Sequence, residues 1–201
     1  MKQLDLWGTS MMADVKHLTM AELVAGLDDI RQAPKDEGAL RLIVRRPRVG
    51  QREILEEGAL DLDEGLVGDT WRERAVARSA DGVPYLLTQL NIMNARVIAL
   101  VAGPKERWPL AGDQLFIDID LSDDNTPAGT RLALGSAVIE VTEEPHTGCQ
   151  KFLTRFGVDA VKFVNSDLGR RLHLRGVNAR VVRPGVIRVG DTAKKLTGRT
   201  V

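Results

Sequence analysis

Residues 129–141 read Gly129-Thr-Arg-Leu-Ala-Leu-Gly135-Ser-Ala-Val-Ile-Glu-Val141. Apolar residues alternate with other residues on both sides of Gly135-Ser136. This pair of residues favours a tight turn. This period of two is typical of strands that turn one face to a core. The segment therefore predicts a β-hairpin, and the chain runs on from it into Pro145-His-Thr-Gly-Cys149.

Other short apolar runs on both sides of this hairpin predict further strands. They span residues 40–45, 53–55 and 96–101, and each is bounded by Gly, Pro or Asp. Residues 115–121 alternate like a strand with one buried face, and a second hairpin is predicted around Pro184-Gly185, joining 177–182 to 186–189. Many short strands with few helices predict a mainly β fold with helical insertions, an α+β chain built on a β-barrel.

Two segments carry a helical period instead. Thr19 and Glu22 have the capping-box spacing, and apolar residues then recur at helical intervals until Pro34. One amphipathic helix over residues 19–32 is predicted, and a second helix is predicted between the hairpins, from the spacing of Val161, Val164, Leu168 and Leu172. We accordingly divide the chain into an N-terminal helical extension, residues 1–38, and a barrel domain, residues 39–201.

Length and cysteine content limit the possible classes. The 201 residues suffice for one sizeable domain, and a single cysteine excludes an internal disulfide, a four-cysteine zinc site and a cysteine-ligated iron–sulfur cluster. A reducing, cytoplasmic location fits best. The N-terminal residues lack the apolar core of a secretory signal, and no apolar run approaches the roughly 18 residues that span a bilayer, so no membrane partner is expected.

The charges balance overall but are segregated along the chain. There are 28 basic and 28 acidic residues, so nothing favours a nucleic-acid partner. Residues 53–69 contain seven carboxylates and no basic residue, whereas residues 151–188 contain nine lysines and arginines and two aspartates. The basic segment either attracts an anionic ligand, since arginine suits phosphate and carboxylate, or consists of ordinary surface arginines paired with the acidic half.

Cys149 is the candidate reactive group. It lies in a Pro- and Gly-containing turn beside His146 and Lys151, and a thiol near cations ionises below its free pKa of about 8.5. The alternative is that the lone cysteine is a small buried hydrophobe. A papain-like pair would need His146 or His173 beside the thiol, and a zinc site would draw on Cys149, His146, His17 and His173, which lack paired ligand spacing. The phosphate-binding and dinucleotide-binding glycine motifs are absent.

Several segments, taken in order, resemble the MOSC family, the domain named for the C-terminal part of molybdenum-cofactor sulfurase. The glycine–aspartate turn 65–69, the strand beginning at Gln89, the hairpin 129–141 and the cysteine turn 145–149 carry the resemblance, with weaker similarity at 111–119, 155–157, 175–181 and 185–191. The resemblance extends over roughly residues 40 to 191. Two departures stand out: Thr70-Trp71 follows Asp69 where many members have a basic residue and a histidine, and Pro-His-Thr-Gly-Cys149 replaces the usual Pro-Arg-x-Pro-Cys.

The resemblance implies a MOSC-type barrel, similar to the pyruvate kinase barrel, that handles the molybdenum cofactor or its sulfur. Cys149 would be either a persulfide sulfur carrier or a ligand of molybdenum. The resemblance and the charge pattern suggest that the cofactor-binding residues are Asp69, Gln89, His146, Lys151, Arg155, Arg175 and Arg180.

Partners follow from the same resemblance. They would be a molybdoenzyme or a cysteine desulfurase, with pyridoxal phosphate only on that desulfurase. A reductase role would need a separate electron donor, because no flavin, haem or iron–sulfur motif is visible. A second hypothesis, of another class, is a non-catalytic binding module for an anionic ligand or a partner protein, with an incidental thiol. The oligomeric state stays open.

Overall fold

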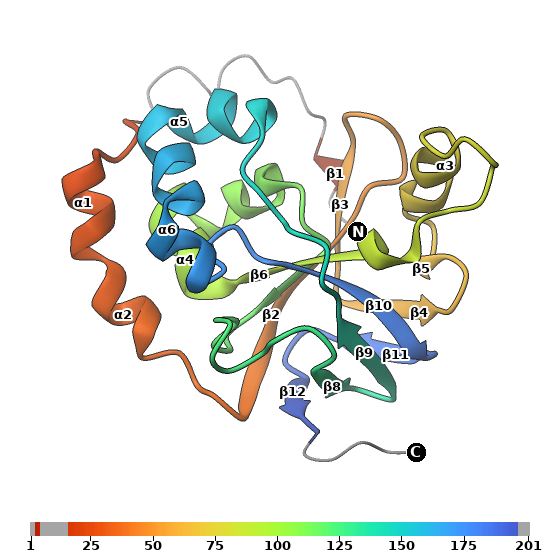
Figure 1. The fold of residues 1–201 in the computed structure, drawn as a ribbon. Helices are drawn as coiled ribbons and strands as arrows, with labels where there is room; N and C mark the ends of the chain where they lie inside the picture. Colours follow the sequence, from red (N-terminus) through yellow and green to blue (C-terminus); the bar gives the residue numbers. More distant parts are fainter. Residues whose placement is uncertain (1–2, 5–15, 197–201) are drawn as a thin grey trace.

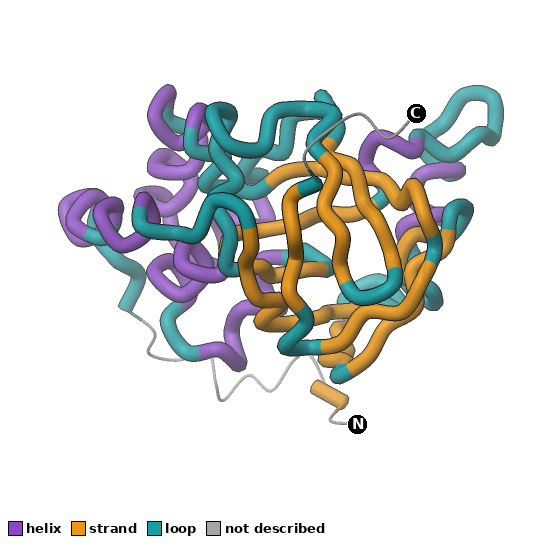
Figure 2. The backbone as a smooth tube through the Cα atoms, turned by 90° about the horizontal axis from the view of Figure 1, so that it is seen from below, coloured by secondary structure: helices purple, strands orange, loops and turns teal. Residues whose placement is uncertain are grey.

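In the computed structural model, which describes residues 3–4 and 16–196, seven strands close into a barrel. The strand order is β2-β12-β8-β9-β10-β6-β7, and β7 returns to pair with β2. Neighbouring strands are antiparallel except β6 and β7. The closed ring is visible in Figure 2 and confirms the predicted barrel. Its strands are β2 (Glu37–Arg45), β6 (Leu90–Asn94), β7 (Leu115–Ile117), β8 (Arg131–Leu134), β9 (Ala137–Val141), β10 (Val177–Arg183) and β12 (Thr192–Lys195).

The predicted hairpin at residues 129–141 is confirmed as β8 and β9. Arg131 pairs with Glu140 and Leu134 pairs with Ala137 across the turn. Gly135 occupies the turn at a φ of 56°, a left-handed conformation that glycine adopts without a steric penalty. The alternating apolar residues of both strands are buried inside the barrel, so the sequence period fixed the register of this hairpin.

A second, smaller sheet lies beside the barrel and contains β11 (Gly185–Arg188), β4 (Glu57–Asp61) and β5 (Gly65–Leu66). The predicted hairpin around Pro184 is therefore wrong: β10 pairs with β6 and β9, whereas β11 pairs with β4. The register of β10 shifts near its end, between Val181 and Arg183, and the chain then leaves the barrel at Pro184. Strands β1 (Gln3–Leu4) and β3 (Arg52–Leu55) extend the barrel sheet beyond β2.

The predicted strand at residues 96–101 is a helix, α4 (Ala95–Ala102). The side chain of Asn94 accepts hydrogen bonds from the backbone N–H groups of Arg96 and Val97, which caps the first turn. Val97, Ile98 and Val101 are then buried on one face. A short apolar run fits a buried strand and a buried helix equally well, and here the cap settles the outcome.

The N-terminal helical segment packs on the barrel. The capping box at Thr19 and Glu22 is confirmed, but the predicted single helix is two short ones, α1 (Met20–Ala25) and α2 (Leu27–Arg31). They meet at Gly26, where a side chain would collide with Leu100 of α4. Buried residues of both helices share a hydrophobic cluster with the outer face of the barrel. The division of the chain at residue 38 stays a prediction.

Helices α1, α2, α4 and α5 (Gln150–Asn165), with α6 (Asp167–Arg171), cover one side of the barrel (Figure 1). The segment predicted to be helical around residues 161–172 is helical, but it consists of the end of α5 and the separate α6, which are divided at the extended residue Ser166. α5 is kinked at Gly157, which has a φ of 88°. α3 (Trp71–Val76) lies away from this layer, beside the strands of the small sheet (Figure 1). The described residues also include two short 3₁₀ helices, η1 (Leu86–Thr88) and η2 (Lys105–Ala111).

Candidate functional site

Five arginines gather near the ends of the barrel strands and the start of α5, and we call them the arginine cluster. Each is linked to at least one other member, because the charge of one lowers the pKa of the other. Among the described residues, they form ion pairs with two carboxylates, Asp69 and Asp113. The cluster therefore carries more positive than negative charge. Its members are Arg46, Arg52, Arg74, Arg155 and Arg175.

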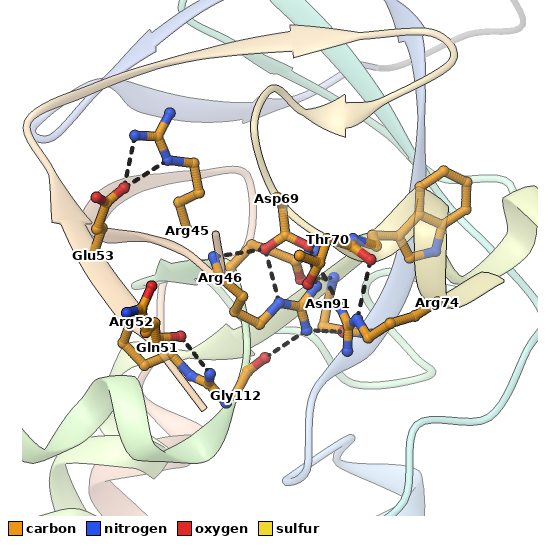
Figure 3. Close-up of polar contacts among 12 residues, drawn as sticks. Arg45, Arg46, Gln51, Arg52, Glu53, Asp69, Thr70, Arg74, Asn91 and Gly112 are labelled. Carbon is orange, nitrogen blue, oxygen red and sulfur yellow. Dashed lines mark hydrogen bonds and ion pairs between the residues drawn. The ribbon is translucent and has the colours of Figure 1, made fainter. Parts of the chain in front are cut away.

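Asp69 anchors the first part of the cluster. Arg46 follows the end of β2, and its guanidinium holds both carboxylate oxygens of Asp69 at 2.8 Å. The backbone N–H groups of Arg46 and Trp71 also donate to this carboxylate, at 2.9 and 2.8 Å. Figure 3 shows Arg46 reaching past Asp69 to the carbonyl of Gly112, to which it donates at 2.9 Å. Arg46, Asp69 and Trp71 are buried, so the pair fixes the end of β2 to the start of α3.

Asp113 anchors the second part, with fewer partners. One nitrogen of Arg175 donates to both oxygens of Asp113 at 2.9 Å, and a second donates to the carbonyl of Ala111. The guanidinium also lies over the ring of Phe152, 4.9 Å from its centroid. His146 Nδ1 lies 3.6 Å from Asp113, too far for a hydrogen bond.

Two polar atoms near Asp113 are left without hydrogen-bond partners among the described residues. They are Arg175 Nε and His146 Nδ1, and both are buried. Burial, followed by the charges of Arg175 and Arg46, holds the pKa of His146 well below its usual 6.5. The imidazole is therefore neutral near pH 7, with one nitrogen available as a donor and the other as an acceptor. Buried polar atoms without partners are uncommon in folded proteins, and they mark this part of the cluster as a place for a ligand.

Among the charges that act on Arg52, that of Arg155 has the largest effect. Burial, followed by the charges of Arg155, Arg46 and Arg74, lowers the pKa of Arg52 to about 10, although the charge of Asp69 acts in the opposite direction. Burial also lowers the pKa of Arg155, while the Cys149 thiolate acts in the opposite direction. Cys149 and Arg155 are thus near enough to interact as charges, with Arg175 beside them.

Cys149 is exposed at the start of α5. It occupies the N-cap position, yet within the described part of the chain its thiol makes no capping hydrogen bond. The alternative in which the lone cysteine is a buried hydrophobe is therefore wrong, because the side chain faces solvent. The thiol is free for chemistry or for ligation.

Two clefts flank the segment 144–147, which leads to Cys149. The first, the α3 cleft, has a volume of about 520 Å³ and lies between α3 and this segment. The second, about 460 Å³, lies between the segment and the end of α5 with α6. His146 lines both clefts, and Arg175 lines the second. Cys149 itself is not among the residues that line either of them.

The structure brings four of the predicted site residues together: Cys149, His146, Arg155 and Arg175. Lys151 is exposed on the first turn of α5. Asp69 belongs to the arginine cluster, although its oxygens are occupied as described. Gln89 is fully buried and bonded through its side chain to the backbone of Leu62 and Val181, while Arg180 lies on β10 with both donating nitrogens on Glu140. The roles of these residues stay predictions.

Sequence reasoning missed Arg46, Arg52, Arg74 and Asp113. Arg46 stands in the basic run Arg45-Arg46-Pro47-Arg48 at the end of a predicted strand, which was an available signal. Strand alternation explains why Arg45 instead turns to Glu53, as Figure 3 shows. Nothing in the local pattern distinguishes Asp113, which becomes a partner only when Arg175 is folded against it.

The donors present fit an anionic, sulfur-liganded cofactor better than a metal held by protein alone. No group of three or more His, Cys, Asp or Glu residues within 3–4 and 16–196 is placed to hold a metal ion. The exposed thiol offers one soft ligand, and the arginines with the orphaned Arg175 Nε offer donors to phosphate. Among the same residues, no helix combines the length and apolar character needed to cross a membrane.

Comparisons with known proteins agree with this architecture. Residues 100–194 match the family model of the MOSC domain. None of the curated proteins matches the chain.

Solved structures share the fold. The YuaD protein from Bacillus subtilis is similar with a TM-score of 0.58 and 17% identity, over 81% of this chain and 97% of that one. YiiM from Escherichia coli is similar with a TM-score of 0.51 and 16% identity, over 81% of this chain and 72% of that one. At such identities the similarity concerns the fold alone.

Proposed function

We propose that this chain, of which residues 100–194 match the family model of the MOSC domain, handles the molybdenum cofactor or its sulfur through the thiol of Cys149. The observation that carries the proposal is the exposed thiol interacting with Arg155 beside an arginine cluster with surplus positive charge. A cationic environment favours the thiolate, which is the form that both sulfur transfer and metal ligation require.

As a sulfur carrier, Cys149 would act by thiol exchange. Its thiolate attacks the terminal sulfur of a donor persulfide, the donor S–S bond breaks, and the donor leaves as a thiolate. The terminal sulfur is now bonded to Cys149, and no oxidant is consumed. Arg155 and Arg175 stabilise the negative sulfur before and after the transfer.

In a cofactor site, the same residues would have different roles: one would ligate the metal and others would bind phosphate. When bound, the cofactor would supply a redox-active metal, for which the Cys149 thiolate would be a soft ligand. Arg155 and Arg175 are positioned near that thiol to hold phosphate oxygens, and the free Nε of Arg175 is an available donor. The neutral imidazole of His146 lies near Asp113 and Arg175, where it can donate or accept a hydrogen bond.

The test is purification from the native host without oxygen, followed by analysis for molybdenum and for persulfide sulfur. The parent protein is expected to hold one of them, and Cys149→Ser is expected to lose it. If Cys149→Ser retains both at the parental level, the proposal is abandoned.

An arginine variant gives a second measurement. Arg155→Gln is expected to lower the retention of molybdenum or persulfide sulfur, because Arg155 interacts with the thiol of Cys149. Lys162→Gln, on the far part of α5, removes the same charge and is expected to leave the retention unchanged. Equal retention in all three proteins would contradict a role for Arg155.

One observation favours the second candidate function, an anion-binding module. The arginine cluster and the orphaned polar atoms exist whether or not the thiol reacts. Under this alternative, binding of an anion survives Cys149→Ser, and neither molybdenum nor persulfide is found in the parent.

A further inference from the structure

We propose that Asn165 is a positioning residue, which holds the backbone of the cysteine turn so that the thiol of Cys149 stays beside the arginine cluster. The inference rests on the proposed function in one respect, that Cys149 is the reacting group, and it deepens that function by naming what sets the position of the thiol. Three observations support it: a pair of hydrogen bonds, the shape of α5 and a glycine that leaves room for the contact.

The side chain of Asn165 bonds to both backbone polar groups of Gly148. The N–H of Gly148 donates to Oδ1 of Asn165 at 2.8 Å, and Nδ2 of Asn165 donates to the carbonyl of Gly148 at 3.1 Å. Within residues 145–148, these are the only hydrogen bonds to another segment of the described chain. Two bonds in opposite directions fix both the position and the orientation of Gly148, which directly precedes Cys149.

A kink in α5 brings Asn165 to the cysteine turn. Asn165 is the last residue of α5, and Gly148 lies two residues before the first. In a straight helix, residues 17 positions apart would be separated by about 25 Å, at about 1.5 Å per residue. Gly157 interrupts the helix with a φ of 88° and a ψ of 168°, and the second half of α5 then returns its end to the start of the first half. The kink is therefore what makes the contact possible.

Asn165 is itself held in place by its surroundings. Phe163 and Val164, the two residues before it, are buried in the hydrophobic cluster on the outer face of the barrel. Arg170 of α6 donates from Nε to the backbone carbonyl of Asn165 at 2.9 Å. By contrast, the residues on either side of Gly148 are exposed. Asn165 thus joins a well-packed helix end to a turn that has little packing of its own.

The glycine at position 148 leaves room for this contact. A β-carbon there would lie 3.0 Å from a methyl group of Val164 and 3.2 Å from Nδ2 of Asn165. Both distances are tighter than ordinary van der Waals contacts. Because Val164 is buried, an added methyl group would displace the turn rather than the helix. Gly148 is therefore a second point at which the turn can be moved, without changing Asn165.

The position of the turn decides which charges the thiol meets. The Cys149 thiolate and Arg175 both act on the pKa of Arg155, so the three groups interact as charges. Arg155 lies in the first half of α5, whereas Asn165 ends the second half. Since the interaction between two charges weakens as their distance grows, a residue that fixes the turn also fixes the electrostatic environment of the thiol.

Alkylation of the single cysteine in the reduced protein by two reagents measures this environment. Iodoacetate is an anion and iodoacetamide is neutral, but both react with the same thiolate. The ratio of their rates at one pH is therefore independent of the amount of thiolate. Nearby cations raise the ratio, because they attract the anionic reagent. We expect the ratio of the folded parent to exceed that of the chain unfolded in urea by about 10-fold. Equal ratios in the two states would overturn the proposal.

Matched asparagine variants assign the effect to Asn165. Asn165→Ala removes both bonds to Gly148 and is expected to lower the ratio by at least about 3-fold. Asn125→Ala is the control, because Asn125 also donates twice from Nδ2 to backbone carbonyls, those of Lys35 and Asp120, and lies outside both clefts. It should keep the parental ratio, even if denaturant titration shows a similar loss of stability. The same change in both variants, or a change in neither, overturns the proposal.

Gly148→Ala tests the same idea with the Asn165 side chain intact, and it serves also if Asn165→Ala does not fold. Its added methyl group displaces the turn from Val164, so the ratio should fall in the same direction as in Asn165→Ala. A folded Gly148→Ala with the parental ratio would contradict the proposal.

The role of Asn165 and the proposed function can fail separately. The rate ratio requires neither molybdenum nor persulfide, so it can support the role of Asn165 in a protein that carries neither. Where the parent does hold one of them, Asn165→Ala is expected to hold less and Asn125→Ala to hold the parental amount. If Asn165→Ala keeps both the parental content and the parental ratio, the function stands and the role of Asn165 is overturned.

Discussion

Asp69 and Asp113 are both buried aspartates paired with a buried arginine, yet their surroundings differ. Asp69 receives donors on both oxygens from Arg46 and from two backbone N–H groups. Asp113 is held by one nitrogen of Arg175, and two polar atoms beside it have no partner. Burying a charge is costly unless it is fully paired, so the first pair is complete and the second is not. Complete pairing indicates a structural role, and incomplete pairing indicates where a ligand would complete it.

Removing the charge of Asp69 should have the largest effect. In Asp69→Asn either orientation of the new amide turns its NH₂ group toward N–H donors that both carboxylate oxygens now accept. We expect a loss of about 3–5 kcal/mol in the free energy of unfolding, measured by denaturant titration. Asp63→Asn, at an exposed position of the same acidic segment, is the control and should change little. A loss below that of Asp113→Asn would break the comparison.

The same substitution at Asp113 should lower the free energy of unfolding by less. The amide oxygen of Asp113→Asn can still accept from Arg175, and its NH₂ group can turn toward the unpartnered His146 Nδ1. Arg175 also keeps its bond to Ala111 and its position over Phe152. The expected loss in the same titration is about 1–2 kcal/mol. The substitution should affect ligand retention more than stability. Retention of molybdenum or persulfide sulfur should therefore fall in a protein that remains folded.

His146 makes part of the stability depend on pH. Its pKa is lower in the folded protein than its usual 6.5, so the unfolded chain takes up the proton first as the pH falls. The stability that this histidine contributes is fully present above pH 6.5, and it is lost progressively as the pH falls from there toward the lower folded pKa. We expect a loss of about 1 kcal/mol over the first pH unit below that value. His146→Gln should remove this loss and His17→Gln should preserve it; identical pH profiles for the parent and His146→Gln would contradict the assignment.

Substitution of Arg180 should have the smallest effect on stability. Its ion pair with Glu140 is partly exposed on β10, and such pairs contribute about 0–1 kcal/mol. Arg180→Gln should therefore lower the free energy of unfolding by no more than that amount. Retention of molybdenum or persulfide should be unchanged as well, whereas Arg175→Gln should reduce it. A loss of retention in Arg180→Gln would instead support the cofactor-binding role that the sequence predicts for it.

Sequence patterns predicted the parts of the fold that depend on neighbouring residues. The β8–β9 hairpin and the Thr19 capping box are local, and both are present. The error at residues 96–101 arose because an apolar run of that length suits a strand or a helix, and the cap at Asn94 was not recognised. The error at Pro184 has a different cause: whether two adjacent strands pair is decided by partners elsewhere, here β9 and β4.

The candidate site was less predictable for the same physical reason. Cys149 and the basic segment after it were evident, and the exposed thiol agrees with that prediction. The buried ion pairs join residues 23 and 62 positions apart, and no sequence period encodes such distances. Asp113 and Arg46 could therefore be identified only once the barrel had brought their partners to them.

The segment from Glu144 to Thr147 has a consequence for regulation, since it borders both clefts on its way to Cys149. If a ligand in one cleft shifts this segment, the shift also alters the shape of the second cleft, where another ligand would bind. Affinities on the two sides are then thermodynamically linked, and the linkage is reciprocal: whatever factor the first ligand imposes on the second, the second imposes on the first.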